Sequence, residues 1–458
     1  MKTYKPKYTR IILILSIALS SCVEQLDDLP QSFTRVYGTE GATELIRITK
    51  LDNGHLLISG EETISESANG ADGYISFLLE TDELGNQVRY RNYAFYEGEF
   101  ELQLSSADKI RPGHYGTNEF TVVWSHIQAV KQLRDGSFFC LGWFAFRPEN
   151  TWWPEGEEQQ GNFYLLLDSH LEPTKWGYFD DSESEGIPNF SITTNSENIH
   201  ELSSGEILFS STHTEYDEDY SVVNRGFSIY KFLPQSATTE VFRYSTGDSN
   251  IIWQAAGFVL SPDGTSLIVN VTQLSTSGSI GGNLVSRAQP SLFKIDIASG
   301  ALISSRIYYT GGLSFCLTQS ENGYVAQVYH PEPGAEIESN TRNWWGSLLF
   351  VDQNLDSLKL VNVTDTNNIL RGLNQIIRTR DGGYVTEFQK NKEYAYSAVL
   401  IKTDADGRVL WRHEVGPDTI IADIVEMSDG GIAYIVSKDF NGIGRRIHLV
   451  KLTAGGKL

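Results

Sequence analysis

The chain has 458 residues, among them 41 glycines, 22 tyrosines, 22 phenylalanines and 9 tryptophans. Charged residues make up 21% and aromatic residues 12% of the sequence, a balance that excludes a largely disordered chain. The formal net charge is −22, which argues against a nucleic-acid partner because phosphate binding needs a concentrated basic surface. The length allows about two to four domains or one large β architecture.

The N-terminal residues 1–21 have the pattern of a bacterial export signal. Four Lys or Arg residues and no acid precede the apolar run 11–19, which is too short to span a bilayer. Leu19-Ser20-Ser21-Cys22 resembles the lipobox of bacterial lipoproteins, in which Cys22 would carry acyl chains such as palmitate and become the first residue of the mature protein. The alternative is an ordinary signal peptide that contains a cysteine.

Residues 22–31 are interpreted as an acylated tether. The resemblance to Gram-negative lipoproteins implies the outer membrane, because Val23 stands where an Asp would resemble an inner-membrane retention signal. The acids Glu24, Asp27 and Asp28 resemble the tether of lipoproteins exported to the cell surface, and the periplasmic side is the alternative. Without residues 1–21 the net charge would be −26. The expected partner is the membrane, reached through a lipid anchor at Cys22, and no nucleic acid is expected.

One ten-residue pattern recurs along the rest of the chain. Each copy has an Asp-Gly, Asn-Gly or Ser-Gly pair, which suits the φ > 0 positions of a tight hairpin turn, followed by alternating apolar residues. A second apolar strand running into another turn follows each copy, so each unit is predicted to have four strands. The turn glycines are Gly54, Gly136, Gly205, Gly264, Gly323, Gly382 and Gly430.

Seven such units predict an all-β fold, a seven-bladed β-propeller of four-stranded blades that occupies residues 32–458 as a single domain. The seventh unit ends after three strands, and residues 32–38 are predicted to supply the fourth and close the ring. Closure would leave no unpaired sheet edge. The predicted units lie near residues 43–95, 126–181, 197–247, 252–310, 313–365, 370–416 and 419–458.

Residues 379–385 (TRDGGYV) and 400–411 (LIKTDADGRVLW) are the clearest copy of the repeat. They resemble the repeat of secreted bacterial β-propeller proteins with the pattern DGGY…LIKTDxxGxxxW. The match is close in the sixth unit, fair in the first and seventh, and degraded elsewhere. The resemblance implies a propeller over the whole mature chain, but no single activity, because propellers host many functions.

The expected topology puts the short turns on one face of the ring and the long connections on the other. Several long connections carry aromatic residues near carboxylates, which suits stacking on sugar rings or an aromatic-anchored protein interface. The alternative is that these side chains pack within their own loops. The candidate ligand-binding residues are Trp143, Trp152, Trp153, Tyr216, Tyr220, Trp344 and Trp345.

Motifs for catalysis or cofactor binding are absent from the sequence. The nine histidines include no HExxH motif and no pair at metal-ligand spacing, and there is no P-loop or G-x-S-x-G motif, so no metal and no cofactor are expected. Cys140 and Cys316 lie in apolar strand-like runs and are predicted to be buried free thiols.

The favoured interpretation is a non-catalytic surface lipoprotein that binds a glycan or a partner protein through the aromatic loops of its membrane-distal face. One alternative is a glycoside hydrolase or lyase that acts at the mouth of the propeller, with catalytic residues that the sequence does not identify. A second alternative is a structural or assembly role in the envelope.

Overall fold

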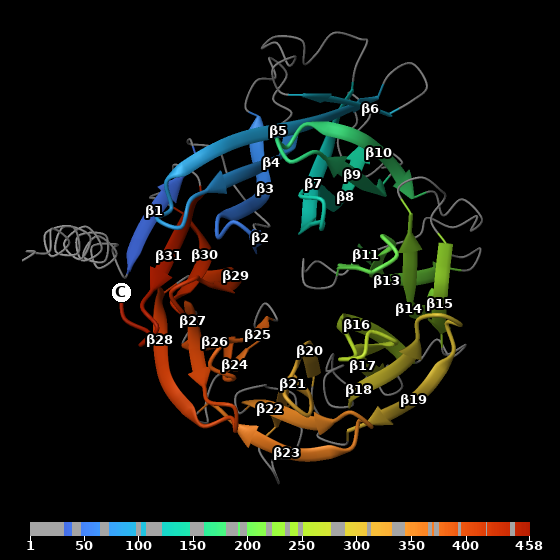
Figure 1. The fold of residues 1–458 in the computed structure, drawn as a ribbon, viewed down its shortest axis with the longest axis vertical. Helices are drawn as coiled ribbons and strands as arrows, with labels where there is room; N and C mark the ends of the chain where they lie inside the picture. Colours follow the sequence, from blue (N-terminus) through green and yellow to red (C-terminus); the bar gives the residue numbers. More distant parts are fainter. Residues whose placement is uncertain are drawn as a thin grey trace, which may run out of the picture.

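In the computed structural model, antiparallel strands form seven blades around a central axis (Figure 1). Every element in the described residues is a β-strand, so the prediction of an all-β, seven-bladed propeller is confirmed. The structure describes residues 32–38, 47–64, 73–97, 102–106, 121–146, 160–179, 191–192, 199–216, 222–233, 239–245, 251–275, 289–308, 313–331, 344–364, 369–370, 375–392, 395–417, 419–439 and 445–458.

Blades 1 to 3 follow one another in the chain. Their strands are β2 (Arg47–Lys50), β3 (Leu56–Ile64), β4 (Gly73–Thr81) and β5 (Gln87–Glu97), with the added β6 (Leu102–Ser106); β7 (Thr121–Gln132), β8 (Phe138–Phe146), β9 (Gln160–Leu167) and β10 (Pro173–Phe179); and β11 (Ser191–Ile192), β12 (His200–Glu201), β13 (Ile207–Tyr216), β14 (Val222–Phe232) and β15 (Thr239–Ser245).

Blades 4 to 7 complete the ring. Their strands are β16 (Ile251–Leu260), β17 (Ser266–Ser275), β18 (Gln289–Asp296) and β19 (Leu302–Ile307); β20 (Leu313–Gln319), β21 (Gly323–Pro331), β22 (Trp344–Asp352) and β23 (Ser357–Asn362); β24 (Ile369–Leu370), β25 (Ile376–Arg378), β26 (Tyr384–Lys392), β27 (Ala395–Thr403) and β28 (Val409–Pro417); and β29 (Ile420–Glu426), β30 (Ile432–Asp439), β31 (Arg445–Leu452) and β1 (Phe33–Tyr37).

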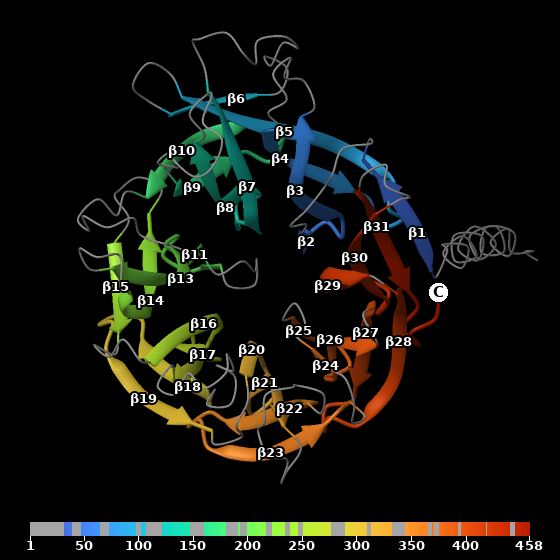
Figure 2. The same ribbon diagram turned by 180° about the vertical axis from the view of Figure 1, so that it is seen from behind.

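The N-terminal strand closes the ring, as predicted. β1 pairs with β31 in antiparallel register from Phe33↔Lys451 to Tyr37↔Ile447. Both views of the ring show β1 and β31 side by side (Figures 1 and 2). Phe33 is buried in the core between blades 7 and 1, so β1 contributes packing as well as hydrogen bonds.

The hydrophobic core lies between the blades. Seven clusters of buried side chains occur in the described residues, and each joins two neighbouring blades, with one cluster at every junction. At the junction of blades 6 and 7, for example, Leu400 of β27 and Tyr434 of β30 share a cluster. Both faces of a blade are therefore apolar, and each blade depends on both of its neighbours for burial.

An aspartate organises the turn between the third and fourth strands of several blades. In blade 6, Asp404 Oδ1 accepts hydrogen bonds from the N–H groups of Asp406 (2.9 Å) and Arg408 (2.8 Å), and Gly407 has a φ of +86°. Leu171 and Leu355 take the glycine position in blades 2 and 5, with φ of 66° and 69°. This backbone costs roughly 1–2 kcal/mol for a residue with a side chain, and burial of each leucine offsets the cost.

At four junctions these turns also tie a blade to the one before it. An aromatic side chain at the outer strand of one blade donates a hydrogen bond to a backbone carbonyl in the next blade's turn. Within the described residues these bonds are Tyr37 Oη to Gly85 O (2.5 Å), Tyr93 Oη to Leu171 O (2.8 Å), Tyr308 Oη to Leu355 O (2.7 Å) and Trp411 Nε1 to Ala454 O (3.0 Å).

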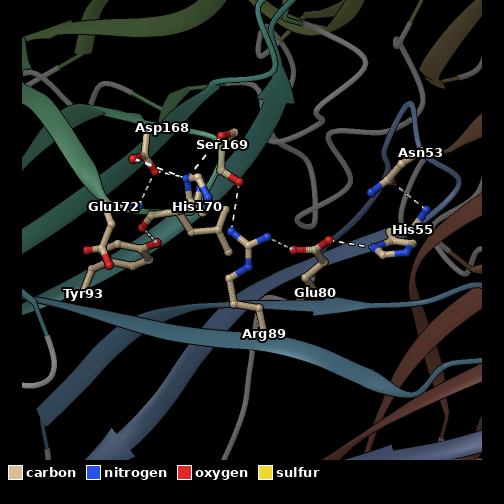
Figure 3. Close-up of polar contacts among 10 residues, drawn as sticks. Asn53, His55, Glu80, Arg89, Tyr93, Asp168, Ser169, His170 and Glu172 are labelled. Atoms are coloured by element: carbon tan, nitrogen blue, oxygen red, sulfur yellow. Dashed lines mark hydrogen bonds and ion pairs between the residues drawn. The ribbon is translucent and has the colours of Figure 1, made fainter.

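Charged side chains reinforce the same junctions, and Figure 3 shows the pattern between blades 1 and 2. Glu80 is buried and contacts both His55 Nδ1 (2.7 Å) and Arg89 Nη2 (3.0 Å). Arg89 then donates through Nη1 to Ser169 O in the second turn of blade 2 (2.9 Å).

The turns between first and second strands and those between third and fourth strands lie on the same side of the ring. We call this side the turn face.

The connection between blades 1 and 2 differs from the sequence expectation. The predicted units end at residue 95 and begin again at residue 126, which leaves no strand between them, but β6 pairs with β5, and the first residues of β7 pair with the last residues of β5. Blades 1 and 2 consequently share one continuous nine-stranded sheet. The consecutive residues Thr121, Val122 and Val123 extend the strand beyond the blade. Their pairing with residues 95–97 of β5 has no signal in the repeat pattern.

Removal of residues 32–38 should destabilise the whole ring. The deletion takes away the pairing with β31 and the burial of Phe33, and the burial alone contributes about 1.5–3 kcal/mol. The exposed edge of β31 should also promote association. The measurement is thermal and urea unfolding of residues 39–458 beside a control chain of residues 32–458. Equal melting of the two chains would contradict the closure model.

Candidate functional site

The side opposite the turn face, here called the open face, carries the connections between second and third strands and those between blades. Strand ends define it: β8 ends at Phe146 and β9 begins at Gln160, while β21 ends at Pro331 and β22 begins at Trp344. By contrast, the first turn of blade 1 is closed by a hydrogen bond from Gly54 N to Leu51 O (3.0 Å). The connections whose length varies between the units therefore lie on the open face.

Four of the seven aromatic candidates lie in strands at the open face, although the sequence assigned them to loops. Trp143 is in β8, Tyr216 ends β13, and Trp344 and Trp345 begin β22. The long second and third strands continue past the expected blade limits in hairpins such as Glu215↔Asn224 and Pro331↔Trp344. Cys22 and the remaining candidates, Trp152, Trp153 and Tyr220, lie outside the described residues.

The two aromatic candidates whose side chains are described do not form one pocket. Trp143 belongs to blade 2 and Trp345 to blade 5, and Figure 1 shows β8 and β22 on opposite sides of the ring. Both side chains are half-buried. They can therefore act only as separate contacts, for a ligand that is large compared with either ring.

Polar side chains surround Trp345. It pairs with His330, whose buried ring lies 2.9 Å from Ser347 Oγ and 3.3 Å from Asn362 Oδ1 through Nε2. The indole Nε1 of Trp345 is itself buried and has no hydrogen-bond partner among the described residues. A buried donor without an acceptor costs about 1–3 kcal/mol, so this N–H favours an acceptor from elsewhere at the open face.

A different environment surrounds Trp143. It pairs with His126 of β7 and Asn162 of β9. Burial, with a smaller effect from the charge of Arg47, lowers the pKa of His126 to about 3, so the ring is neutral at pH 7. Its Nδ1 lies 3.8 Å from Glu61 Oε2, which is too long for a hydrogen bond.

Three charged residues that the sequence did not single out meet near the axis, where blades 6, 7 and 1 adjoin. Arg47 lies on the innermost strand of blade 1 and donates through Nη1 to Ala422 O of β29 (3.3 Å). Asp423 follows on β29, and its two oxygens accept hydrogen bonds from Ile48 N (2.9 Å) and Ile424 N (3.0 Å). These bonds join the innermost strands of blades 7 and 1.

The third member of this group is Glu387 of β26. It is 1% exposed, and neither of its carboxylate oxygens has a hydrogen-bond partner among the described residues. Burial raises the pKa of Glu387 well above its usual value, with Arg47 lowering it and Asp423 raising it further. Burial likewise raises the pKa of Asp423 to about 6, against the opposing charge of Arg47.

Arg47, Asp423 and Glu387 have a structural role. Asp423 binds two backbone N–H groups, and its charge balances Arg47 at neutral pH, so it holds blades together rather than facing a ligand. The sequence signal was present but unused: each residue is a charge within an apolar strand run, as in YVTEF and IIADIV. Such interruptions in alternating strands mark buried polar groups that need a partner.

The remaining sequence predictions concern thiols, metals and membrane spans. Cys140 and Cys316 are buried thiols outside any disulfide, as predicted, and burial raises the pKa of the Cys140 thiol. Among the residues that the structure describes, no group of three or more His, Cys, Asp and Glu is placed to hold a metal ion. Within the same residues, no helix is long and apolar enough to cross a membrane.

Comparison with known proteins adds little to this geometry. No family model matches the chain, and no curated protein is similar to it in sequence. A protein of unknown function from Dyadobacter fermentans aligns over 93% of this chain and 99% of its own, with 11% identity and a TM-score of 0.48. Hydrazine synthase from Kuenenia stuttgartiensis aligns over 90% of this chain and 98% of its own, with 12% identity and a TM-score of 0.45. The NanB sialidase of Streptococcus pneumoniae aligns over 94% of this chain and 72% of its own, with 10% identity and a TM-score of 0.39. Such low similarity supports no inference about activity.

Replacement of Glu387 by Gln should be tolerated at pH 7, whereas Asp423→Asn should cost about 3 kcal/mol because it leaves Arg47 without its buried counter-charge. In the wild type, the contribution of Glu387 to the free energy of unfolding is fully present below pH 4.5. It is lost as the pH rises through the raised pKa that Glu387 has in the folded protein. Glu387→Gln lacks this loss, so its free energy of unfolding relative to wild type should increase with pH above 4.5. Urea unfolding at stepped pH measures both effects.

Blade 5 offers the reciprocal control. Gln327 and Glu387 both stand three residues after a tyrosine, Tyr324 or Tyr384, that pairs with the end of the third strand. Gln327→Glu should therefore gain the pH dependence that Glu387→Gln loses. A Glu387→Gln protein as unstable as Asp423→Asn at pH 7 would show that the Glu387 carboxylate is needed in its charged form.

Proposed function

We propose that this protein is a lipid-anchored protein of the Gram-negative outer membrane whose open face binds a glycan without catalysing a reaction. The observation that carries the proposal is the contrast between the two faces. The turns of the turn face are short, uniform and, at four junctions, joined to the neighbouring blade by hydrogen bonds, whereas the long connections and the aromatic strand ends lie at the open face. Binding residues are typically placed on variable segments of a rigid scaffold in this way.

A glycan fits the spacing of the aromatic residues. Trp143 and Trp345 stand on blades 2 and 5 as separate, half-buried rings. An aromatic ring stacks on the apolar face of one sugar unit, and a polysaccharide repeats that unit over distances larger than a single pocket. The buried indole N–H of Trp345 would gain an acceptor from a sugar oxygen or from a neighbouring segment.

The proposed anchor gives the ring an orientation. β1 begins at Phe33, which pairs with Lys451 just before the second turn of blade 7, so the chain enters the ring at the turn face. An acylated Cys22 would be joined to it by residues 23–31, which span at most about 30 Å. The turn face would then lie toward the membrane and the open face away from it, whether the protein stands on the cell surface or on the periplasmic side.

The enzyme alternative has less support. The most perturbed carboxylates in the described residues are Glu387 and Asp423, and Asp423 is occupied by the backbone of Ile48 and Ile424. Perturbed pKa values occur in structural ion pairs as well as in active sites. The arrangement of this pair suits a role in joining blades 6, 7 and 1.

Substitution of both described tryptophans tests the proposal. In affinity electrophoresis against immobilised polysaccharides, wild-type protein should be retarded by at least one of them without releasing product. Trp143→Ala combined with Trp345→Ala should weaken retention about tenfold or more, as expected for the loss of two stacking contacts of 1–1.5 kcal/mol each.

Tyr90→Ala provides a matched control, because Tyr90 is an exposed aromatic residue on an outer strand of blade 1. It should leave retention unchanged. Unchanged retention of the double tryptophan variant would contradict the choice of residues, and release of shorter saccharides would favour the hydrolase or lyase. Binding to a purified envelope protein but to no polysaccharide would replace the glycan with a protein partner.

A further inference from the structure

The geometry points to a second and smaller binding site, on the turn face between blades 6 and 7, that takes a single uncharged sugar ring. A cavity of about 210 Å³ lies there. Its apolar surface comes from Trp411, Ile432 and Ala454. It is distinct from the open face, and neither Trp143 nor Trp345 contributes to it.

Trp411 forms a fixed wall of this cavity. Its Nε1 donates to Ala454 O (3.0 Å). Its ring packs against the backbone of Gly456, where an added Cβ would lie 2.5 Å from Trp411 Cδ2. Only glycine allows this contact, and its φ of +74° requires glycine as well. The indole is therefore held in place before any ligand arrives.

Two cations and two acids line the rest of the cavity. Lys402 is almost completely buried and donates to Asp381 Oδ1 (2.7 Å). Arg380 donates through Nη1 to Ser428 O (2.7 Å), and its backbone N–H donates to Glu426 Oε2 (3.0 Å). Because these charges balance one another locally, the lining favours a neutral ligand with hydroxyl groups over an ion.

The next junction of the ring shows a side chain that fills the equivalent volume. Between blades 7 and 1, the Glu83 side chain extends over Gly54, where an added Cβ would lie 2.0 Å from Glu83 Oε1. Ser428 Oγ donates to the same oxygen (2.5 Å). Ala454 occupies the position of Glu83 in blade 7, since an added Cβ on Gly430 would be 3.9 Å from the Ala454 Cβ.

The exchange of glutamate for alanine therefore opens a space that the protein closes elsewhere with a carboxylate side chain. Pockets for drug-sized molecules measure roughly 300–1,000 Å³, so a cavity below that range admits one ring but not an oligosaccharide. A pyranose matches the lining because its C–H face can lie on Trp411 while its hydroxyls reach the carboxylate and guanidinium groups at the rim.

Fluorine NMR of protein labelled with 5-fluorotryptophan tests the site directly. The resonance of Trp411 is identified as the one missing from Trp411→Phe. Titration with methyl β-D-glucopyranoside, methyl β-D-galactopyranoside and N-acetylglucosamine should give a saturable shift of that resonance with at least one of them. A ligand of this size is expected to bind with a Kd of about 1 mM.

Ala454→Glu restores the side chain that closes the neighbouring junction, and it should weaken binding by about tenfold or more. Ala405→Glu is the matched control, because Ala405 holds the same turn position in blade 6 and lies outside the cavity lining. It should leave the Trp411 response unchanged. The other tryptophan resonances report in each variant that the ring is folded.

The inference is overturned if wild-type protein gives no saturable Trp411 shift with any of these sugars, or if Ala454→Glu binds as wild type does. A stronger response to glucuronate than to the neutral glycosides would overturn the assignment to an uncharged ring. Trp143→Ala combined with Trp345→Ala should keep the Trp411 response, so failure of this site and failure of the open-face proposal are separate results.

Discussion

The structure depends on the burial that each blade obtains from its two neighbours. In the part of the chain that the structure describes, one hydrophobic cluster fills each of the seven junctions, and none of these clusters is confined to one blade. A blade at an open end would expose one apolar face and one strand edge. The pairing of β1 with β31 removes both, because Phe33 enters the cluster between blades 7 and 1. Ring closure therefore sets the stability of every blade, including those far from β1 in the chain.

The junctions are specified by polar ties on the turn face. Tyr37, Tyr93, Tyr308 and Trp411 each reach a carbonyl in the next blade's turn. Ion pairs beside them act within a blade and join its first turn to its own third strand. Lys402 contacts Asp381 in blade 6 and Lys451 contacts Asp429 in blade 7, whereas blade 1 reverses the charges and pairs Glu80 with His55 and Arg89. The two charge patterns give the same connection. A face committed to these ties has little freedom for a large ligand, which leaves the open face for variable segments.

The sequence was sufficient for the repeating parts of the fold. The turn glycines and period-two strands predicted seven blades, and the missing fourth strand of the last unit predicted closure by residues 32–38. Features that arise from contacts between blades were not predictable in this way. The pairing of β5 with β7 depends on where two chain segments meet in space, and the meeting of Arg47, Glu387 and Asp423 depends on three blades. The four aromatic candidates within the described residues lie at the open face, where strand extension beyond the blades puts Trp143 and Trp345 in hairpins rather than loops.

Differences between equivalent positions carry more functional information than the repeat itself. Glu83 and Ala454 occupy the same turn position, yet one closes a junction and the other leaves a cavity lined by Trp411. Gln327 and Glu387 likewise share a strand position, but Gln327 Nε2 donates to Glu387 O (2.6 Å) while the Glu387 carboxylate has no partner among the described residues. Because the backbone is nearly the same in each pair, the change in side chain alone decides whether the position is filled, charged or open. A repeat protein can thus acquire a site in one blade while its other junctions keep their packing.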